Sequence, residues 1–378
     1  MKSELTWVEV SRAALKKNIQ IFRKSVGKNV IIAPSVKANA YGHGLIETTK
    51  TILQAGADWV CVNALFEAGA LRNAGVRAPI YIKGYVPHKD LPEAVDRDTD
   101  LVVYNKESIQ ALGRYTNKAK KNARVHIKIE TGNNRQGVLL DTLKDFVQTI
   151  QKYPYIEITG AATHFADIED SPDQKYANYQ LENFQKGIEI LKACGVEPPY
   201  LHCANSAATL LYPNTHFTMV RPGIATYGLW PSELIARRVQ KKFGIQLTPA
   251  LSWKTRIAQI KDIPAGSYVG YGCTYKTKRR TRLAILPVGY YDGYDRGLSN
   301  KSWAIIRDKK APVRGRVCMN ITMVDVSNIP EARLEDEVIL LGRDGKAGMS
   351  IDEMAALADT INYEIPTRIR ESIPRVIV

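Results

Sequence analysis

The residues best suited to chemistry are polar groups that directly follow short β-branched runs of the sequence. One run leads into Val36-Lys37-Ala38-Asn39-Ala40-Tyr41-Gly42-His43-Gly44, which places a lysine ahead of a glycine-rich turn. Other runs lead into Arg135, His164 and Arg221, accompanied by small hydrogen-bonding residues. A lysine amine can form an imine with a carbonyl compound, and arginine binds phosphate groups. The set therefore suits an anionic, phosphate-bearing ligand held at a lysine.

The order of predicted elements supplies a scaffold that brings these residues together. From residue 30 onward, short β-branched runs alternate with amphipathic segments. The predicted strands cover residues 30–34, 59–62, 80–83, 101–104, 124–130, 156–161, 200–203 and 217–220, and helical spacing recurs at residues 45–55, 64–73, 143–152 and 178–193. Eight alternations predict an α/β fold with a parallel (β/α)8 TIM-type barrel. Functional groups of such barrels follow the strands, so the polar segments should meet at one barrel mouth.

A second domain is indicated after about residue 235, where strands with tight turns replace the alternating pattern. The predicted strands there include residues 252–260, 282–286, 304–306, 316–319 and 337–341. Residues 6–10 also predict a strand, which we expect to join this second domain. We therefore expect a barrel over residues 11–235, and a mainly β domain formed by residues 1–10 and 236–378.

The composition excludes several classes of protein. The chain has 378 residues, 45% hydrophobic and 24% charged, as in globular rather than disordered or fibrous proteins. The formal charge of +15 attracts anions, but the basic cluster at residues 276–282 lacks a nucleic-acid-binding motif, so no nucleic-acid partner is expected. Without a signal peptide or a long apolar run, a cytoplasmic protein with no membrane partner is expected. Scattered cysteines and histidines predict neither disulfides nor a metal.

Six segments carry a resemblance to a known family. They read SVKANAYGHG, HCANSAA, MVRPGIATYGL, GYGCTY, LPVGYYDGY and GRVCMN, and similar segments occur in the same order in alanine racemases. The chain resembles this family over nearly its whole length. The resemblance implies a pyridoxal 5'-phosphate enzyme that racemises alanine and has a barrel followed by a β domain.

By this resemblance, two residues act as acid/base groups. Lys37 resembles the lysine that holds the cofactor as an imine and then transfers a proton. Tyr271 resembles the second acid/base, contributed by the partner subunit, with His164 as its neighbour. Two groups are needed because racemisation removes a proton from one face of the α-carbon and returns it on the other. An unperturbed tyrosine titrates near pH 10, so Tyr271 needs cationic or hydrogen-bonding neighbours.

The resemblance also implies how the cofactor is bound. Arg221 resembles the arginine that hydrogen-bonds the pyridine nitrogen, with His202 behind it. Because guanidinium stays protonated, the ring nitrogen must accept this bond, and the ring becomes a weaker electron sink. The expected phosphate-binding groups are Tyr41, Asn205, Ser206 and the backbone amides of Gly223 and Ile224.

Further residues are expected around the substrate. Arg135 resembles a residue near the phenolic oxygen of the cofactor and the substrate carboxylate. Lys128 matches a lysine that is often carboxylated in this family, where the carbamate would hold Arg135; an ordinary buried lysine is the alternative. Met319 is expected to offer its backbone N–H to the substrate carboxylate, and Tyr290 to line the entrance from the partner chain. A head-to-tail homodimer with shared active sites follows.

Four features depart from the family pattern near the expected pocket. The first is the loop Asn133-Asn134-Arg135-Gln136, because in the family Met-Gly normally precedes the arginine and an aliphatic residue follows it. The other three are single residues: Asn320 in place of an aspartate, Glu371 in place of a tyrosine, and Lys83 in place of an aliphatic residue. A carboxylate in place of an aromatic residue should widen the entrance and favour cationic side chains. Turnover of serine, or of lysine and arginine, beside alanine is therefore an alternative.

Two other activities and two biological roles remain open at this point. A non-catalytic pyridoxal-phosphate protein would resemble the barrel alone, whereas this chain also has the Gly270-Tyr271-Gly272 segment. A decarboxylase of the same fold would use a cysteine of the second domain, where Cys318 lies, but the surroundings of Cys318 match the racemase segment. A racemase could supply D-alanine for peptidoglycan or degrade D-amino acids.

Overall fold

The structure is a computed structural model that describes residues 4–171 and 173–378, and it divides into two compact units. One unit, here called the β unit, combines the chain up to Arg12, the segment Tyr41–Gly44 and Ala250–Val378. The other, here called the barrel unit, contains Ala13–Ala40 and Leu45–Pro249.

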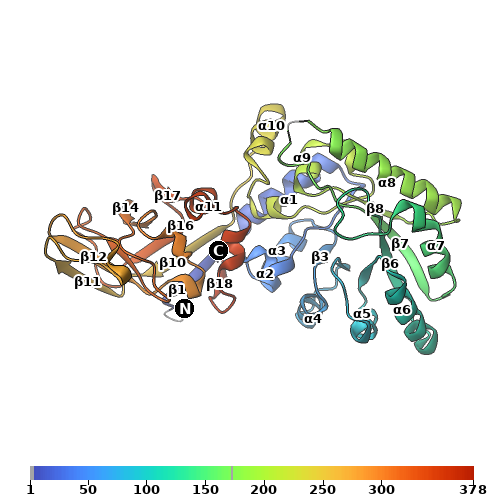
Figure 1. The fold of residues 1–378 in the computed structure, drawn as a ribbon, viewed down its shortest axis with the longest axis horizontal. Helices are drawn as coiled ribbons and strands as arrows, with labels where there is room; N and C mark the ends of the chain where they lie inside the picture. The colour runs from blue at the N-terminus through green and yellow to red at the C-terminus, as the bar shows by residue number, and fades with distance from the viewer. Residues whose placement is uncertain (1–3, 172) are drawn as a thin grey trace. The chain divides into compact units, whose positions relative to one another are not determined.

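Eight short parallel strands form the barrel unit (Figure 1). They are β2 (Ile31–Ile32), β3 (Val60–Val62), β4 (Ile80–Ile82), β5 (Asp100–Val103), β6 (Ala123–Lys128), β7 (Ile156–Ala162), β8 (Tyr200–His202) and β9 (Met219–Val220). Strands β3 to β8 pair in sequence order, and β2 pairs with β9. Two backbone hydrogen bonds of 2.8 Å, from Cys61 N to Pro34 O and from Val36 N to Cys61 O, join the segment after β2 to β3. A third bond of 3.2 Å, from Thr218 N to Leu201 O, joins the start of β9 to β8. The ring is closed, which confirms the predicted barrel.

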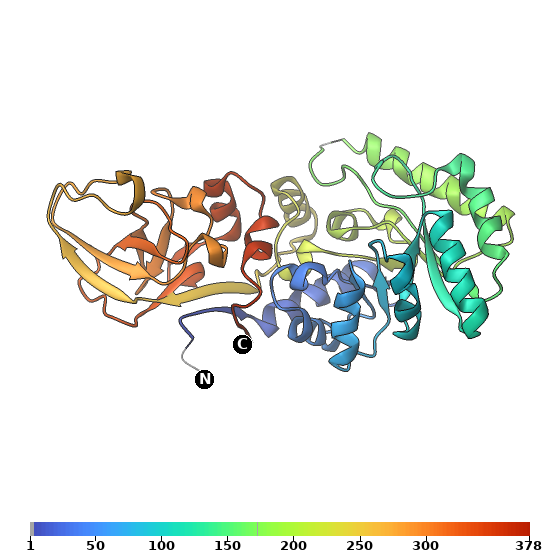
Figure 2. The same ribbon diagram turned by 60° about the horizontal axis from the view of Figure 1, so that its bottom comes forward.

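Helices alternate with these strands and lie outside them, as Figure 2 shows. They are α1 (Arg12–Val26), α2 (Lys37–Tyr41), α3 (Leu45–Gln54), α4 (Leu65–Asn73), α5 (Leu91–Asp96), α6 (Lys106–Ala119), α7 (Leu140–Gln151), α8 (Lys175–Ala193), α9 (Ser206–Leu211) and α10 (Glu233–Phe243). Helix α7 buries Leu143, Phe146, Val147 and Ile150, whose spacing makes one apolar face. Among the described residues, no helix is long and apolar enough to cross a bilayer.

An aromatic layer fills part of the barrel interior. Trp59 and Tyr81 are buried with Ala33 and Met219, and Tyr200 packs against them. The imidazole of His126, on β6, stacks on Tyr81 with ring centroids 4.5 Å apart and planes at 23°. A polar ring inside an apolar layer needs hydrogen-bond partners, because an unpaired buried polar atom costs free energy.

Two sheets make up the β unit. The larger has the order β14-β13-β16-β10-β1-β18, with β17 paired to β16, and the smaller has the order β11-β12-β15. The strands are β1 (Thr6–Val10), β10 (Leu251–Arg256), β11 (Gln259–Ile263), β12 (Thr281–Leu286), β13 (Trp303–Ile306), β14 (Lys309–Pro312), β15 (Thr322–Asp325), β16 (Glu337–Asp344), β17 (Ala347–Met349) and β18 (Arg375–Ile377). The N-terminal strand β1 lies between β10 and β18 and pairs with both.

The β unit also corrects one prediction. Residues 316–319, expected as a strand, form an irregular loop. The N–H of Val317 donates to Ser299 Oγ at 3.0 Å, and that of Cys318 donates to Ile321 O at 2.9 Å, so neither is available to a strand ladder. Short helices complete the unit: η4 (Tyr271–Cys273), η5 (Tyr290–Asp292), η6 (Arg296–Leu298), α11 (Ile351–Ala358) and α12 (Glu364–Arg368).

Replacing Gly42 tests whether the β unit is packed as closely around this residue as the structure shows. Its φ is +82°, and a Cβ built there would lie 1.8 Å from Pro366 O. We expect Gly42→Ala to lower the urea midpoint strongly or to prevent folding. Gly27 is a matched control, because its φ is +79° but nothing lies within 4 Å of its Cβ. Gly27→Ala should cost only about 1 kcal/mol of left-handed backbone strain. If the urea midpoints of the two variants fell by the same amount, a steric clash at Gly42 would not be the cause.

Candidate active site

Lys37 begins a left-handed turn, α2, which is separated from strand β2 by four residues. Its next three residues, Ala38, Asn39 and Ala40, have φ of 54°, 54° and 53°, and Tyr41 continues with 52°. This conformation costs roughly 1–2 kcal/mol for each residue with a side chain. Such strain persists only where the surroundings enforce it, which is typical of functional sites.

Two side chains hold this turn. Asn39 Oδ1 accepts the N–H of Leu45 at 2.7 Å, which fixes the end of the turn at the start of α3. Glu67 Oε1 accepts the N–H of Ala38 at 2.6 Å, which fixes the residue next to the lysine. Both bonds join backbone and side chain, so the turn is held independently of any strand ladder.

The amine of Lys37 is prepared for nucleophilic attack. Burial is the main reason that its pKa lies below the usual lysine value, and the Arg135 cation lowers it further. Glu67 opposes this change. A lower pKa leaves more neutral amine near pH 7, and the neutral amine is the form that attacks a carbonyl carbon.

Other cations gather at the carboxyl ends of the barrel strands. Lys83 follows β4, and its Nζ donates to Ser35 Oγ at 2.6 Å. Burial lowers the pKa of Lys83 to about 7. Burial, and then Arg221, also hold the pKa of Lys128, at the end of β6, well below its usual value. Because these cations repel one another, this end of the barrel favours an anionic ligand.

Arg221 follows β9 and has an unused donor. Its Nη2 donates to Thr163 O at 2.7 Å, while Nε is buried and has no hydrogen-bond partner in the part of the chain that the structure describes. Nearby, Ser206 Oγ accepts the N–H of Gly223 at 2.8 Å, and Asn205 caps α9. The expected phosphate-binding segments therefore contact each other, and a donor without an acceptor lies at the same end of the barrel.

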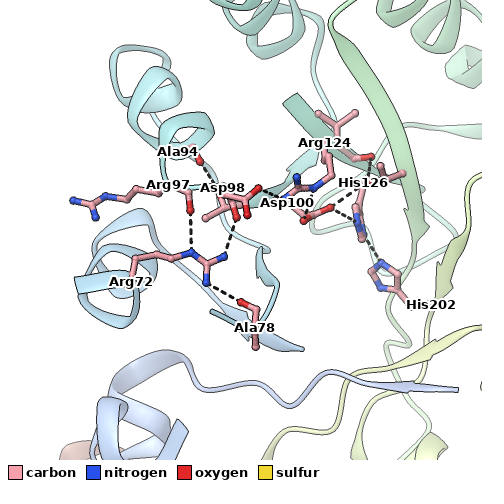
Figure 3. Close-up of polar contacts among 12 residues, drawn as sticks. Arg72, Ala78, Ala94, Arg97, Asp98, Asp100, Arg124, His126 and His202 are labelled. Carbon is pink, nitrogen blue, oxygen red and sulfur yellow. Dashed lines mark hydrogen bonds and ion pairs between the residues drawn. The ribbon is translucent and has the colours of Figure 1, made fainter. Parts of the chain in front are cut away.

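A chain of buried groups leads from Asp100 to His202 through the barrel (Figure 3). His126 Nδ1 lies 2.8 Å from His202 Nε2. On its other side, His126 Nε2 lies 3.3 Å from Asp100 Oδ1, an ion-pair contact rather than a well-aligned hydrogen bond. Arg124 Nε donates to the second oxygen of Asp100 at 3.1 Å. Burial raises the pKa of Asp100, but His126 and Arg124 hold it below the usual value.

The anionic end of this chain assigns the protons on both imidazoles. Because the negative charge of Asp100 lies 3.3 Å from His126 Nε2, we place the His126 proton on Nε2, and Nδ1 then accepts from His202 Nε2–H at 2.8 Å. His202 Nδ1 is left as a free lone pair, and it has no partner among the described residues. Burial and then the Arg221 charge hold the pKa of His202 well below its usual value, so this ring stays neutral. A neutral acceptor therefore lies within electrostatic reach of Arg221.

His164 follows β7 and borders a cavity of about 250 Å³ in the barrel unit. Other residues lining this cavity include Arg135, Glu169 and Asn205. Burial is the first cause that holds the pKa of His164 well below its usual value, and Lys128 is the second. His164 is thus a neutral imidazole beside an open space.

The β unit presents three of the predicted site residues on exposed loops. The side chains of Tyr271, Tyr290 and Met319 are 74%, 44% and 55% exposed. Tyr271 begins η4 after Gly270, whose φ is +70°. The N–H of Tyr290 donates to Cys318 O at 3.0 Å, which places Tyr290 beside the loop of Met319.

Two further predicted residues also belong to the β unit. The ring centroid of Tyr41 lies 6.4 Å from that of Tyr363. Glu371 lies in the exposed loop between α12 and β18, and its carbonyl accepts from Arg375 Nη1 at 3.1 Å. The barrel unit contains the other candidates, namely Lys37, Lys128, Arg135, His164, Asn205, Ser206, Arg221, Gly223 and Ile224.

Sequence reasoning missed three buried residues of this region. Glu67 accepts backbone N–H groups at the start of α4, but the residue three positions before it is Ala64 rather than Ser or Thr, so the sequence carried no capping-box signature. His126 is two positions before Lys128 on the same predicted strand, so both point to one face. No local pattern in the sequence pointed to Asp100, because its partner His126 lies on the neighbouring strand rather than nearby in the sequence.

The buried histidines predict a pH dependence of stability. His126, His164 and His202 have pKa values lowered mainly by burial, so they bind protons more readily when unfolded. Their contribution is complete above the ordinary value of 6.5 and is lost as the pH falls below it, at about 1.4 kcal/mol per pH unit for each. We expect His202→Gln to reduce the change of unfolding free energy with pH, between about pH 5 and 6.5, by the contribution of one histidine. Urea unfolding at a series of pH values measures this change.

Exposed His88 provides the control for this experiment. His88→Gln should leave the slope unchanged. A His202→Gln protein with the full slope of the original chain would show that His202 does not remain neutral when folded.

Comparison with known proteins extends over both units. The family model of the alanine racemase N-terminal domain matches residues 10–231, and that of the C-terminal domain matches residues 250–377. The alanine racemase of Leptospira interrogans is 39% identical, covering 99% of this chain and 96% of its own length, and that of Methanococcus maripaludis is 38% identical, covering 100% and 99%. The crystal structure of Bacillus anthracis alanine racemase with bound L-Ala-P is 35% identical, covers 100% of this chain and 96% of its own, and has a TM-score of 0.93. Since the match includes the loops that carry Lys37 and Tyr271, this chain belongs to the alanine racemase family.

Proposed function

We propose that this protein interconverts L- and D-alanine with pyridoxal 5'-phosphate bound at Lys37. One observation supports this most directly: a partly buried amine of lowered pKa and a buried Arg221 N–H that lacks a partner among the described residues occur at the same end of one barrel. The relatives named alanine racemase favour alanine over serine, lysine or arginine, and favour an enzyme over a non-catalytic binding protein.

The residues of the barrel unit fit this cofactor. Its aldehyde matches the amine of Lys37, and its ring nitrogen is an acceptor for the unused Nε–H of Arg221. Its negative charges would be balanced by the cations at this end of the barrel, including Lys83 and Arg135. Its phosphate would be held by Asn205, Ser206 and the backbone N–H groups of Gly223 and Ile224, and by Tyr41, which ends α2 and is counted with the β unit. When bound, the cofactor acidifies the α-hydrogen of the attached amino acid.

Two groups of the protein then move the proton. Lys37, as a neutral amine, accepts it on one face of the α-carbon. We infer that Tyr271 of the partner subunit supplies a proton on the other face, and that the neutral imidazole of His164 accepts a hydrogen bond from its phenol. Arg135 and the backbone N–H of Met319 of the partner subunit would hold the substrate carboxylate, so that both faces stay open to their bases.

The surface of the β unit supports a dimer in which sites are shared. The large side chains of Tyr271, Tyr290, Tyr291, Met319 and Ile321 are 44–74% exposed. Exposed apolar patches of this kind are typical of protein–protein surfaces. We infer that a second copy covers them in a head-to-tail homodimer, with Tyr271 and Tyr290 lining the partner's site. The five unpaired cysteines are consistent with the reducing cytoplasm.

We also propose that the Lys128 amine is carboxylated by carbon dioxide. The reaction requires a neutral amine, and burial together with Arg221 holds the pKa of Lys128 well below its usual value. The amine nitrogen bonds to carbon dioxide and loses a proton, which leaves a carbamate anion among cations. This anion would hold Arg135 in place by a charge-assisted hydrogen bond.

Three of the residues that depart from the family pattern have polar partners within the chain. Gln136 Nε2 donates to Tyr104 Oη at 3.2 Å, Asn320 Nδ2 donates to Asp292 Oδ2 at 3.3 Å, and Lys83 bonds Ser35. Their polar groups are thus engaged within the chain. Alanine, whose side chain is a methyl group, requires no further polar partner.

The test is racemisation itself. Purified protein with added cofactor should show the absorption of an imine and should convert L-alanine to D-alanine on chiral chromatography. Lys37→Ala should abolish both, because no other residue is assigned to bind the aldehyde. Lys50→Ala, at a lysine 41% exposed on α3, should change neither. Absence of an imine band in the original chain would overturn the proposal.

Tyr271→Phe separates the two bases. It should keep the imine band and lower kcat for racemisation by about 10²–10⁴-fold, as expected for loss of an acid/base group. Lys37 should still exchange the α-hydrogen of one enantiomer with deuterium from solvent. Exchange of both enantiomers at the original rate would show that Tyr271 is not the second base.

Carboxylation predicts a signal specific to Lys128. Protein equilibrated with ¹³C-bicarbonate should give a carbamate carbon resonance that Lys128→Ala lacks. Lys83→Met is the matched control, because Lys83 is another buried amine of lowered pKa. If the resonance persists in Lys128→Ala, or disappears in Lys83→Met, the carbamate is not on Lys128.

A further inference from the structure

We infer that Glu67 is the positioning residue of Lys37: one buried carboxylate joins the left-handed turn that carries the lysine to the start of helix α4. This inference deepens the proposed function, on which it rests for the role of Lys37. Glu67 itself is assigned to no contact with cofactor or substrate.

Both oxygens of Glu67 are bonded to backbone. Oε1 accepts the N–H of Ala38 at 2.6 Å, and Oε2 accepts those of Asn63 at 2.7 Å and Ala64 at 3.0 Å. The residue is only 3% exposed. Bonds to a charged acceptor are shorter and stronger than bonds between neutral groups, and a buried carboxylate strongly requires them. The loops after β2 and β3 are therefore tied together through a single side chain.

Helix capping accounts for only one of the two oxygens. Glu67 is the third residue of α4, and its Oε2 bonds at Asn63 and Ala64 serve the start of that helix. The Oε1 bond reaches Ala38, 29 residues away in the sequence, and contributes nothing to the cap. It falls on the first left-handed residue after Lys37, where the backbone needs an external constraint to keep its conformation.

The charge of Glu67 also acts on the amines. It raises the pKa of Lys37, against burial and the Arg135 cation, and it raises the pKa of Lys83 in the same way. If Glu67 loses its charge, the pKa of Lys37 should fall further, since only the lowering influences remain. A residue that merely capped α4 would not be expected to change the titration of Lys37.

Glu67→Gln tests both effects. The amide oxygen can still accept from Ala38, but its NH2 group would face the N–H groups of Asn63 and Ala64, so the arrangement on both sides is disturbed. In the cofactor-free protein, we expect hydrogen exchange of the Ala38 amide to rise by about tenfold or more. The Lys37 amine, followed by NMR after ¹³C-reductive methylation, should titrate at lower pH. The imine band should form more slowly on adding pyridoxal 5'-phosphate, and kcat should fall more than KM changes.

Matched variants show whether the effect is specific. Glu47→Gln removes another first-turn carboxylate, one that is 62% exposed and lies 3.4 Å from Lys50, and it should change none of these readouts. Ala38→Gly added to Glu67→Gln should restore part of the rate of imine formation, because glycine adopts left-handed backbone without a penalty. It should not restore the titration of Lys37, which depends on the missing charge. Glu67→Asp, with its charge but a shorter side chain, is the alternative if Glu67→Gln does not fold.

The outcomes separate this inference from the proposed function. The positioning role would be overturned if, in Glu67→Gln, the hydrogen-exchange rate of the Ala38 amide and the titration of the Lys37 amine were the same as in the original chain and in Glu47→Gln. This holds whether or not the imine band is normal. Absence of the band in the original chain would instead refute the proposed function. The exchange and titration measurements would still decide the structural role of Glu67, since neither needs the cofactor.

Discussion

Burial of several cations at one end of the barrel is the constraint on which the rest of the site depends. Lys37, Lys83 and Lys128 all have pKa values lowered mainly by burial, and the guanidinium groups of Arg135 and Arg221 add charge that cannot be lost. The folded chain accommodates this charge when the amines release protons and an anion binds. The unfavourable burial of positive charge therefore accounts both for a nucleophilic lysine and for an anion-binding pocket.

Buried acceptors fix the backbone and the imidazoles that lie near these cations. Glu67 holds the backbone beside Lys37, and the Asp100 carboxylate orders the protons of His126 and His202. These acceptors are buried, so their bonds are not weakened by competition with water. The strained turn and the neutral histidines are thus held by buried acceptors, whereas the Nε–H of Arg221 is left without an acceptor among the described residues.

The β unit contributes chemistry of another kind. Its candidate residues lie on exposed segments held by backbone contacts, such as the bond from Tyr290 N to Cys318 O. Because Tyr271 is exposed within its own chain, the neighbours that it needs, His164 among them, are assigned to the site of the partner subunit.

The sequence by itself determined the architecture and the residues that follow the barrel strands. Strand and helix periods are local, so eight alternations predicted the barrel, and its topology placed Lys37, Arg135, His164 and Arg221 at the ends of strands. The loop at residues 316–319 was predicted wrongly because an alternating pattern also fits a loop with one buried side. Only the tertiary structure decided which polar atoms are buried, bonded or left without a partner. Glu67 meets Ala38 across 29 residues and His126 meets His202 across 76, and no local period records such contacts, because packing between distant segments creates them.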